Sequence, residues 1–274
     1  MSERTDNLLT QDYVQLEVLQ PTLRPLIPDQ TRLKNISKAM LAEEMKTNPS
    51  IDLIRKMKAE SMDLDWDKIY ANDLMRFEVS VEKDFNETLA FRRQQNSFRW
   101  VLNHMQKEKY VLDVGCFNGA FTRIMKEEGY YPSGTDVSQH CIDVSKKNND
   151  GLSIPYFKMP NSYQIPVQKE LFDYVTCMQV LEHVEDPYLF VEELFRVVKK
   201  GGTLFVSTPI NENLDDPMHL HHFTLYDIMY LFEKYTDDFK IIYLNKIKKT
   251  ASANIFMIVA RKPLEVYTPT IVVE

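Results

Sequence analysis

Glycine is scarce in this sequence and is confined to one part of it. Only 7 of the 274 residues are glycine, and all lie between Gly115 and Gly202, whereas proteins average about 7% glycine. Because glycine is used where the backbone must turn sharply or let a ligand come close, this distribution predicts ligand-binding loops in the middle third of the chain.

Other features that the sequence lacks exclude whole classes of protein. It contains no run of 18 apolar residues, which excludes a membrane-spanning helix. The N-terminal segment MSERTDNLLTQ does not have the cationic-then-apolar order of a signal peptide. Three cysteines (Cys116, Cys141 and Cys177) are an odd number, which argues against a disulfide scaffold. We therefore expect a globular, cytoplasmic protein, and its net charge of −7 gives no overall attraction to nucleic acid or anionic lipid.

Composition and apolar spacing divide the chain into three parts. Residues 1–85 contain no glycine and carry apolar residues at helical spacing, so we expect a helical N-terminal extension that caps the following domain. A domain is predicted over residues 86–263, opening with a long amphipathic helix over 86–109. Residues 264–274 form a C-terminal tail.

From residue 110 onward, apolar strands alternate with helices. The helices have capping residues at Ser138, Asp186 and Thr224, and Gly201-Gly202 is predicted to end the helix before the fifth strand. Strands are predicted over 110–114, 131–136, 156–159, 172–178, 203–207, 240–245 and 254–260. This alternation predicts an α/β fold with a doubly wound, mostly parallel, seven-stranded Rossmann-like sheet. Ligands of such sheets bind beyond the carboxyl ends of the strands.

The first motif, D-V-G-C-F-N-G, begins at the end of the first of these strands. Asp113 precedes a turn that carries Gly115 and Gly119 and leads into a helix, whose N-terminus presents free N–H groups. The carboxylate suits an ammonium or a hydroxyl, and it would repel a pyrophosphate. The spacing is G-x-x-x-G and differs from the G-x-G-x-x-G of dinucleotide sites, which argues against a nicotinamide cofactor. The alternative is an ordinary strand–turn–helix corner.

The second motif, G-T-D-V-S, ends the next strand with Asp136. This residue lies 17 positions after Gly119, where a nucleoside site needs a carboxylate for the ribose hydroxyls. The alternative is that Asp136 only caps the following helix.

A third motif, F-D-Y-V-T-C-M-Q-V-L-E-H-V over 172–184, makes the pattern specific. Together with V-V-K-K-G-G-T-L and S-T-P further on, the three motifs resemble class I S-adenosylmethionine-dependent methyltransferases. The L-E-H-V form is similar to the subgroup of ubiquinone-biosynthesis and sugar or small-molecule O-methyltransferases. The resemblance covers about residues 86–262, and it implies that the last two strands form a C-terminal antiparallel hairpin.

The resemblance also implies a set of cofactor-binding residues. Asp113 and the turn would hold the methionine part, Asp136 the ribose, Val137 and Asn161 the adenine, and the end of the fourth strand the sulfonium. The full set is Asp113, Gly115, Cys116, Phe117, Gly119, Asp136, Val137, Asn161, Met178 and Gln179. Phe117 stands where relatives commonly have glycine, and Asn161 where many have an acid.

Histidines gather after the fourth and fifth strands, where both segments are expected to overhang the methyl donor. These are His183, His219, His221 and His222. Transfer to a hydroxyl commonly needs a base, and a histidine titrating near neutrality suits that task. We therefore predict that His183 or His221 is catalytic, that no metal is bound, and that the acceptor is a hydroxyl of a small molecule or sugar.

Three alternatives remain open. Glu182-His183 with a later histidine resembles the metal-dependent small-RNA methyltransferases that modify the terminal ribose, although Gln179 stands where those enzymes have a further acid. A nicotinamide-dependent dehydrogenase would share the sheet and Asp136. A catalytically inactive cofactor-binding or scaffolding protein is suggested by Phe117 and the long extension.

Overall fold

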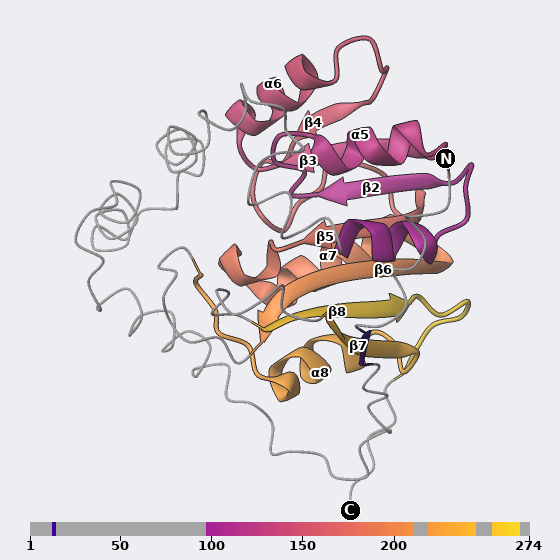
Figure 1. Ribbon diagram of the computed structural model, residues 1–274. Coiled ribbons are helices and arrows are strands. Elements are labelled where there is room, and N and C mark those ends of the chain that lie inside the picture. Colours follow the sequence, from indigo (N-terminus) through magenta and orange to yellow (C-terminus); the bar gives the residue numbers. More distant parts are fainter. Residues whose placement is uncertain (1–12, 15–96, 211–218, 245–253, 269–274) are drawn as a thin grey trace, which may run out of the picture.

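The computed structural model describes residues 13–14, 97–210, 219–244 and 254–268, which form a layered α/β structure (Figure 1). The strands are β1 (Tyr13–Val14), β2 (Tyr110–Val114), β3 (Tyr131–Asp136), β4 (Tyr156–Lys158), β5 (Phe172–Met178), β6 (Val198–Ile210), β7 (Phe239–Leu244) and β8 (Asn254–Arg261). The helices are α5 (Ala120–Glu127), α6 (Gln139–Asn148), the short 3₁₀ helix η3 (Leu181–His183), α7 (Pro187–Val197) and α8 (Leu225–Glu233), together with a helix over residues 97–103.

One sheet runs through the molecule in the order β1-β7-β8-β6-β5-β2-β3-β4. Strands β4, β3, β2, β5 and β6 are parallel, and β8 pairs antiparallel with both β6 and β7. The opposed arrowheads of β2 and β8 show this change of direction (Figure 1). The predicted doubly wound, mostly parallel sheet with a C-terminal antiparallel hairpin is confirmed.

The sheet has one strand more than the sequence predicted. Tyr13–Val14 pairs antiparallel with Leu244 and Tyr243 at the outer edge of β7. This strand belongs to the segment that was predicted to be helical. The rest of the predicted extension, residues 1–12 and 15–85, lies outside the described residues, so its helical character stays a prediction.

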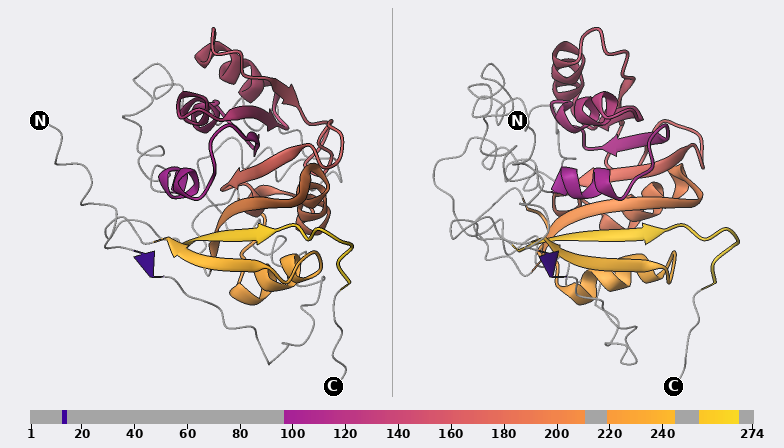
Figure 2. Two further views of the ribbon diagram at one scale, coloured as in Figure 1. Left: turned by 90° about the vertical axis from the view of Figure 1, so that its right-hand side faces the viewer. Right: turned by 45° about the vertical axis from the view of Figure 1, so that its right-hand side comes forward.

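Two hydrophobic cores cover the two faces of the sheet. Alternate residues of β2 face opposite sides, so Val111 joins one core while Leu112 and Val114 join the other. The first core contains residues of the 97–103 helix and α5, and the second contains residues of α7 and α8. In the left view of Figure 2, the 97–103 helix and α5 lie on one side of the sheet and α7 on the other. Both faces of the central parallel strands are therefore buried, as strand–helix alternation requires.

The predicted helix caps are present. Ser138 Oγ accepts from the backbone N–H of Cys141, and Asp186 accepts from the first turn of α7. Thr224 forms a reciprocal capping box with Asp227. These caps fix where α6, α7 and α8 begin, and Ser138 starts α6 directly after the end of β3.

Two predicted boundaries are wrong. The helix predicted over 86–109 ends at residue 103, because the chain needs residues 104–109 to turn back into β2, with Glu108 in the left-handed region at φ 60°. Gly201 and Gly202 lie inside β6, which begins at Val198. The strand pairing shifts between Phe172 and Tyr174, and a Cβ on Gly202 would press on the carbonyl oxygens of Asp173 and Lys199. The glycines thus make an irregularity within a strand, in place of the predicted helix end.

Among the described residues, no helix combines the length and the apolar character needed to cross a bilayer.

Candidate functional site

The turn between β2 and α5 is held against the end of β3. The backbone N–H groups of Gly115 and Cys116 both donate to the carbonyl oxygen of Thr135, at 2.8 and 3.0 Å. Gly115 and Gly119 have φ values of 72° and 76°, which L-residues rarely adopt. Phe117, where the sequence resemblance implies a glycine, has a φ of 49° and so occupies a glycine-like conformation. A non-glycine residue in this region is strained, and such strain concentrates at functional sites.

Asp113 is a buried carboxylate near the carboxyl end of β2. Its side chain is 3% exposed, and Thr176 Oγ1 on the neighbouring strand β5 donates to Asp113 Oδ1 at 2.8 Å. Burial raises the pKa of Asp113 to about 7, the Thr176 hydrogen bond opposes this rise, and the nearby charge of Asp136 adds to it. A cation placed beside this carboxylate would restore its ionised form.

Asp136 ends β3 and connects the turn to the next helix. Its Oδ2 accepts from the backbone N–H of Phe117 at 3.1 Å, and its Oδ1 accepts from that of Ser138 at 2.9 Å. Ser138 is the N-cap of α6. The alternative that Asp136 only caps this helix is therefore wrong. A carboxylate oxygen can accept more than one hydrogen bond.

Val137 and Asn161 lie beside this strand end. Val137 is partly buried against the core on the α7 face. The segment after β4 is joined to β3 by a hydrogen bond from Met159 N to the Asp136 carbonyl oxygen at 2.8 Å. Asn161 follows on this segment, and its Oδ1 accepts from the backbone N–H of Tyr163.

The end of β5 carries Met178 and Gln179. Met178 is buried with the core that contains α5. Gln179 has a φ of 58°, so it is, after Phe117, a second non-glycine residue of these strand-end segments in the left-handed region. Its backbone N–H donates to the Ser207 carbonyl oxygen at 2.9 Å, and its Nε2 donates to Ser207 Oγ at 3.2 Å. The carboxyl ends of β2, β3 and β5 therefore assemble one site from separate parts of the chain.

The two histidine-bearing segments, after β5 and after β6, meet as predicted, and the contact is between His183 and His219. Ligand atoms of Glu182, His183 and His219 all lie within 4.8 Å of one another, and the rings of the two histidines make an edge contact. Glu182 is fully buried, and its Oε2 accepts from Thr208 Oγ1 at 2.9 Å. Its Oε1 has no hydrogen-bond partner in the described part of the chain.

His221 points elsewhere. The residue is 3% exposed, its Nε2 lies 2.8 Å from the Val184 carbonyl oxygen, and its ring stacks on Phe223. Because a carbonyl oxygen can only accept, Nε2 carries the proton and donates it. This buried, hydrogen-bonded position does not favour the predicted catalytic role of His221, and of the two candidates it leaves His183.

Sequence reasoning did not find the residues that support the turn. Asn149 Nδ2 donates to the Gly119 carbonyl oxygen at 3.1 Å, and the hydroxyls of Thr122 and Tyr156 are hydrogen-bonded to each other. A Cβ on Gly119 would collide with Asn149 and Tyr156. Thr122 lies on α5, Tyr156 on β4 and Asn149 directly after α6, and no local motif connects them. Thr176 was missed as well, because its position opposite Asp113 depends on the register between β2 and β5.

The sheet order is that of a Rossmann-like fold, and it places two buried carboxylates, Asp113 and Asp136, at neighbouring strand ends. Residues 112–206 match the family model Methyltransf_11, described as a methyltransferase domain. The chain is 38% identical over 109 residues to a ubiquinone biosynthesis O-methyltransferase from Coxiella burnetii, covering 39% of this chain and 46% of that relative. The chain thus spans about half the length of the curated relatives it matches.

Solved structures share the fold. An S-adenosylmethionine-dependent methyltransferase from Methanosarcina mazei has a TM-score of 0.51 at 20% identity, covering 61% of this chain and 98% of that chain. Phosphoethanolamine N-methyltransferase 2 from Haemonchus contortus, in complex with S-adenosyl-L-methionine, has a TM-score of 0.52 at 16% identity. The match covers 61% of this chain and 52% of that chain. Residues 112–206 are thus similar in sequence to methyltransferase domains, and the described structure shares its fold with these solved structures.

Proposed function

We propose that the protein is an S-adenosylmethionine-dependent methyltransferase that acts on a hydroxyl of a small molecule or sugar. The observation that carries this proposal is the pair of buried carboxylates at adjacent strand ends, Asp113 and Asp136, inside a domain that matches methyltransferases. The O-methyltransferase relatives support a small-molecule hydroxyl as the acceptor.

The residues present fit this cofactor. Asp113, whose pKa is raised by burial, would accept the ammonium of the methionine part, and Asp136 would accept the ribose hydroxyls. When bound, the cofactor supplies an activated methyl group on its sulfonium. Phe117 and Gln179, both at positive φ, would border the methionine part and the sulfonium.

The domain would then mainly align donor and acceptor. Alignment of two reactants can contribute about 7–11 kcal/mol to lowering a barrier. His183, which follows β5 on η3, would take the proton from the acceptor hydroxyl as the methyl group is transferred. A positioned base of this kind contributes about 10²–10⁴-fold.

Calorimetry with the full chain tests the cofactor assignment. We expect saturable binding of S-adenosylhomocysteine and none of NADH. Formation of S-adenosylhomocysteine from S-adenosylmethionine should then appear with a panel of phenolic and sugar hydroxyl compounds. Binding of NADH in place of S-adenosylhomocysteine would support the dehydrogenase alternative, and cofactor binding with no transfer to any acceptor would support the inactive one.

A second candidate function is metal-assisted methyl transfer, as in the enzymes that modify a terminal ribose. The specific observation in its favour is the cluster of Glu182, His183 and His219, with the buried Glu182 Oε1 that lacks a partner in the described chain. One carboxylate and two imidazoles suit Zn²⁺ better than Mg²⁺, which prefers oxygen ligands.

Chelation separates the two candidates. If His183 acts as a base, enzyme treated with a chelator and desalted should keep its full turnover with the small-molecule acceptor. If chelation abolishes turnover and adding Zn²⁺ or Mn²⁺ alone restores it, the metal-assisted mechanism is supported and the role of His183 as a base is contradicted. Glu182→Gln should then abolish the recovery, whereas Glu192→Gln, at an exposed position on α7, should not.

A further inference from the structure

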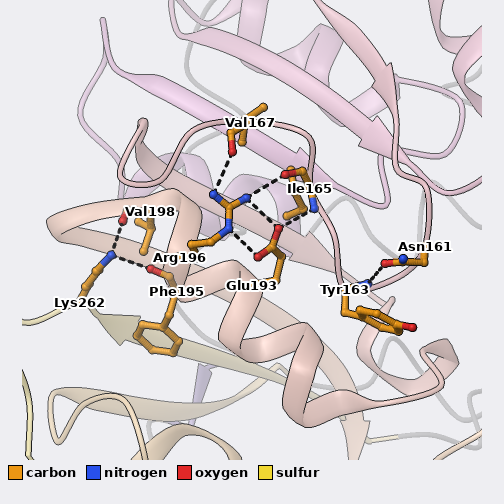
Figure 3. A network of polar contacts seen from close by, with 9 residues as sticks. All are labelled: Asn161, Tyr163, Ile165, Val167, Glu193, Phe195, Arg196, Val198 and Lys262. Atoms are coloured by element: carbon orange, nitrogen blue, oxygen red, sulfur yellow. Dashed lines mark hydrogen bonds and ion pairs between the residues drawn. The ribbon is translucent and has the colours of Figure 1, made fainter.

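The segment between β4 and β5, residues 159–171, forms the side of the site next to Asp136. It contains no regular strand, and its one internal bridge joins Asn161 to Gln164. Such a segment needs partners from outside to fix the position of Asn161. Some of those partners come from α7 (Figure 3), and another is Glu185, which precedes that helix.

Arg196 and Glu193 of α7 bind the backbone of this segment at Ile165 and Val167. Arg196 Nη2 donates to the Ile165 carbonyl oxygen at 2.8 Å, and Nη1 donates to that of Val167 at 2.9 Å. Glu193 Oε1 accepts from the backbone N–H of Ile165 at 2.6 Å. Figure 3 shows the two side chains converging on Ile165. Both backbone groups of Ile165 are thus satisfied by side chains of one helix turn.

The two side chains also hold each other. Arg196 Nε donates to Glu193 Oε2 at 2.6 Å, and Nη2 donates to Glu193 Oε1 at 2.8 Å. This two-point contact uses the planar fork of arginine, which a lysine ammonium does not reproduce. The pair therefore has a fixed geometry relative to the helix.

The near end of the segment has its own contact with the same part of the chain. Ser162 Oγ donates to Glu185 Oε2 at 2.6 Å, and Glu185 immediately precedes Asp186, the cap of α7. Asn161 lies next to Ser162 and is held in a turn by its own hydrogen bond to Tyr163. The position of Asn161 is consequently tied to α7 at two points.

We propose that Arg196 and Glu193 are positioning residues for recognition of the adenine base, because they hold the segment that carries Asn161 against the end of β3. This inference rests on the proposed S-adenosylmethionine site. Neither residue touches the cofactor in this proposal; they act through the backbone of Ile165 and Val167.

The test compares two ligands that differ only in the base. Binding of S-adenosylhomocysteine and of S-inosylhomocysteine, which has an oxygen in place of the adenine amine, is measured by calorimetry on the full chain. The wild type should prefer the adenine ligand by about tenfold or more, since one good hydrogen bond is worth about that factor. Arg196→Lys and Glu193→Gln should reduce the preference to less than about threefold.

The ratio of the two affinities distinguishes a positioning role from a general role in stability. A general loss of stability weakens the binding of both ligands equally and leaves the ratio unchanged. Glu192→Gln is the matched control, since Glu192 is exposed on the same helix and pairs with Lys234. It should keep the wild-type ratio. If Arg196→Lys does not fold, Glu193→Gln decides alone.

An unchanged ratio in the variants, or a wild type without base preference, would overturn the inference while leaving the cofactor assignment standing. A wild type that binds neither ligand would instead overturn the proposed function itself.

Discussion

Replacing Asp113 with asparagine should lower the affinity for S-adenosylhomocysteine by about tenfold to a hundredfold. The variant keeps the size of the side chain and a partner for Thr176 but loses the charge that would face the ammonium. A charged hydrogen bond in a buried site is worth about 1.5–3 kcal/mol, which corresponds to that loss in affinity. Calorimetry measures it, with the exposed Asp143→Asn on α6 as the control. Equal affinity in wild type and Asp113→Asn would remove Asp113 from the site.

The same variant should change the pH dependence of binding. With a pKa of about 7 in the free protein, Asp113 must lose a proton before it can receive a cation. The wild-type dissociation constant should therefore rise about tenfold from pH 7 to pH 5.5, and binding at pH 6 should release a proton to the buffer. Asp113→Asn should show neither effect.

The stability of the ligand-free protein should fall as the pH rises, whereas cofactor binding should strengthen. Burial raises the pKa from 3.8 to about 7, so the folded protein binds more protons than the unfolded chain between these values. Protonated Asp113 therefore contributes its full stabilisation below pH 4, and this contribution is lost as the pH rises through 7. A shift of this size corresponds to on the order of 4 kcal/mol. Melting curves at pH 5 and pH 8 should differ less in Asp113→Asn than in wild type.

Replacing His183 with alanine should lower kcat by about a hundredfold or more, if His183 is the base for the acceptor hydroxyl. The KM for the cofactor should stay near the wild-type value, because His183, the last residue of η3, is proposed to face the acceptor and not the cofactor. Steady-state kinetics with a hydroxyl acceptor measures both constants.

His221→Ala provides the matched comparison. Since His221 is buried and donates to the Val184 carbonyl oxygen, its loss should lower the melting temperature and leave the kcat of the folded fraction nearly unchanged. Wild-type kcat in His183→Ala, or a hundredfold loss of kcat in a fully folded His221→Ala, would contradict this assignment of roles.

The sequence was sufficient to predict the parts of the site that depend on strand order. Asp113 and Asp136 end neighbouring strands of a parallel sheet, and parallel topology brings such ends to one edge. The caps Ser138, Asp186 and Thr224 were predictable because capping is local. The contacts of Asp113 and Asp136 with a cofactor stay predictions.

The choice among the histidines depended on a tertiary contact. The carbonyl oxygen of Glu182 accepts from the backbone N–H groups of Leu220 and His221, at 2.7 and 3.1 Å. This contact fixes the segment after residue 218, with His219 beside His183 and His221 in the core. Both histidines lie in one short stretch, so periodicity cannot distinguish them. The edge strand β1 was missed for a similar reason, since its two residues are defined only by pairing with β7.

The place of β8 in the sheet has a consequence for synthesis of the chain. β8 lies between β6 and β7, although both precede it in the sequence, and its Met257 packs in the same core as Phe98 and Phe121. A ribosome-bound chain that has emerged only as far as residue 244 therefore has β7 with no neighbour on its inner side and β6 with an open edge. Such edges are where growing chains pair wrongly or with one another. The sheet can be completed only once residues 254–261 have left the ribosome, so we expect a late folding event in which one strand joins both halves.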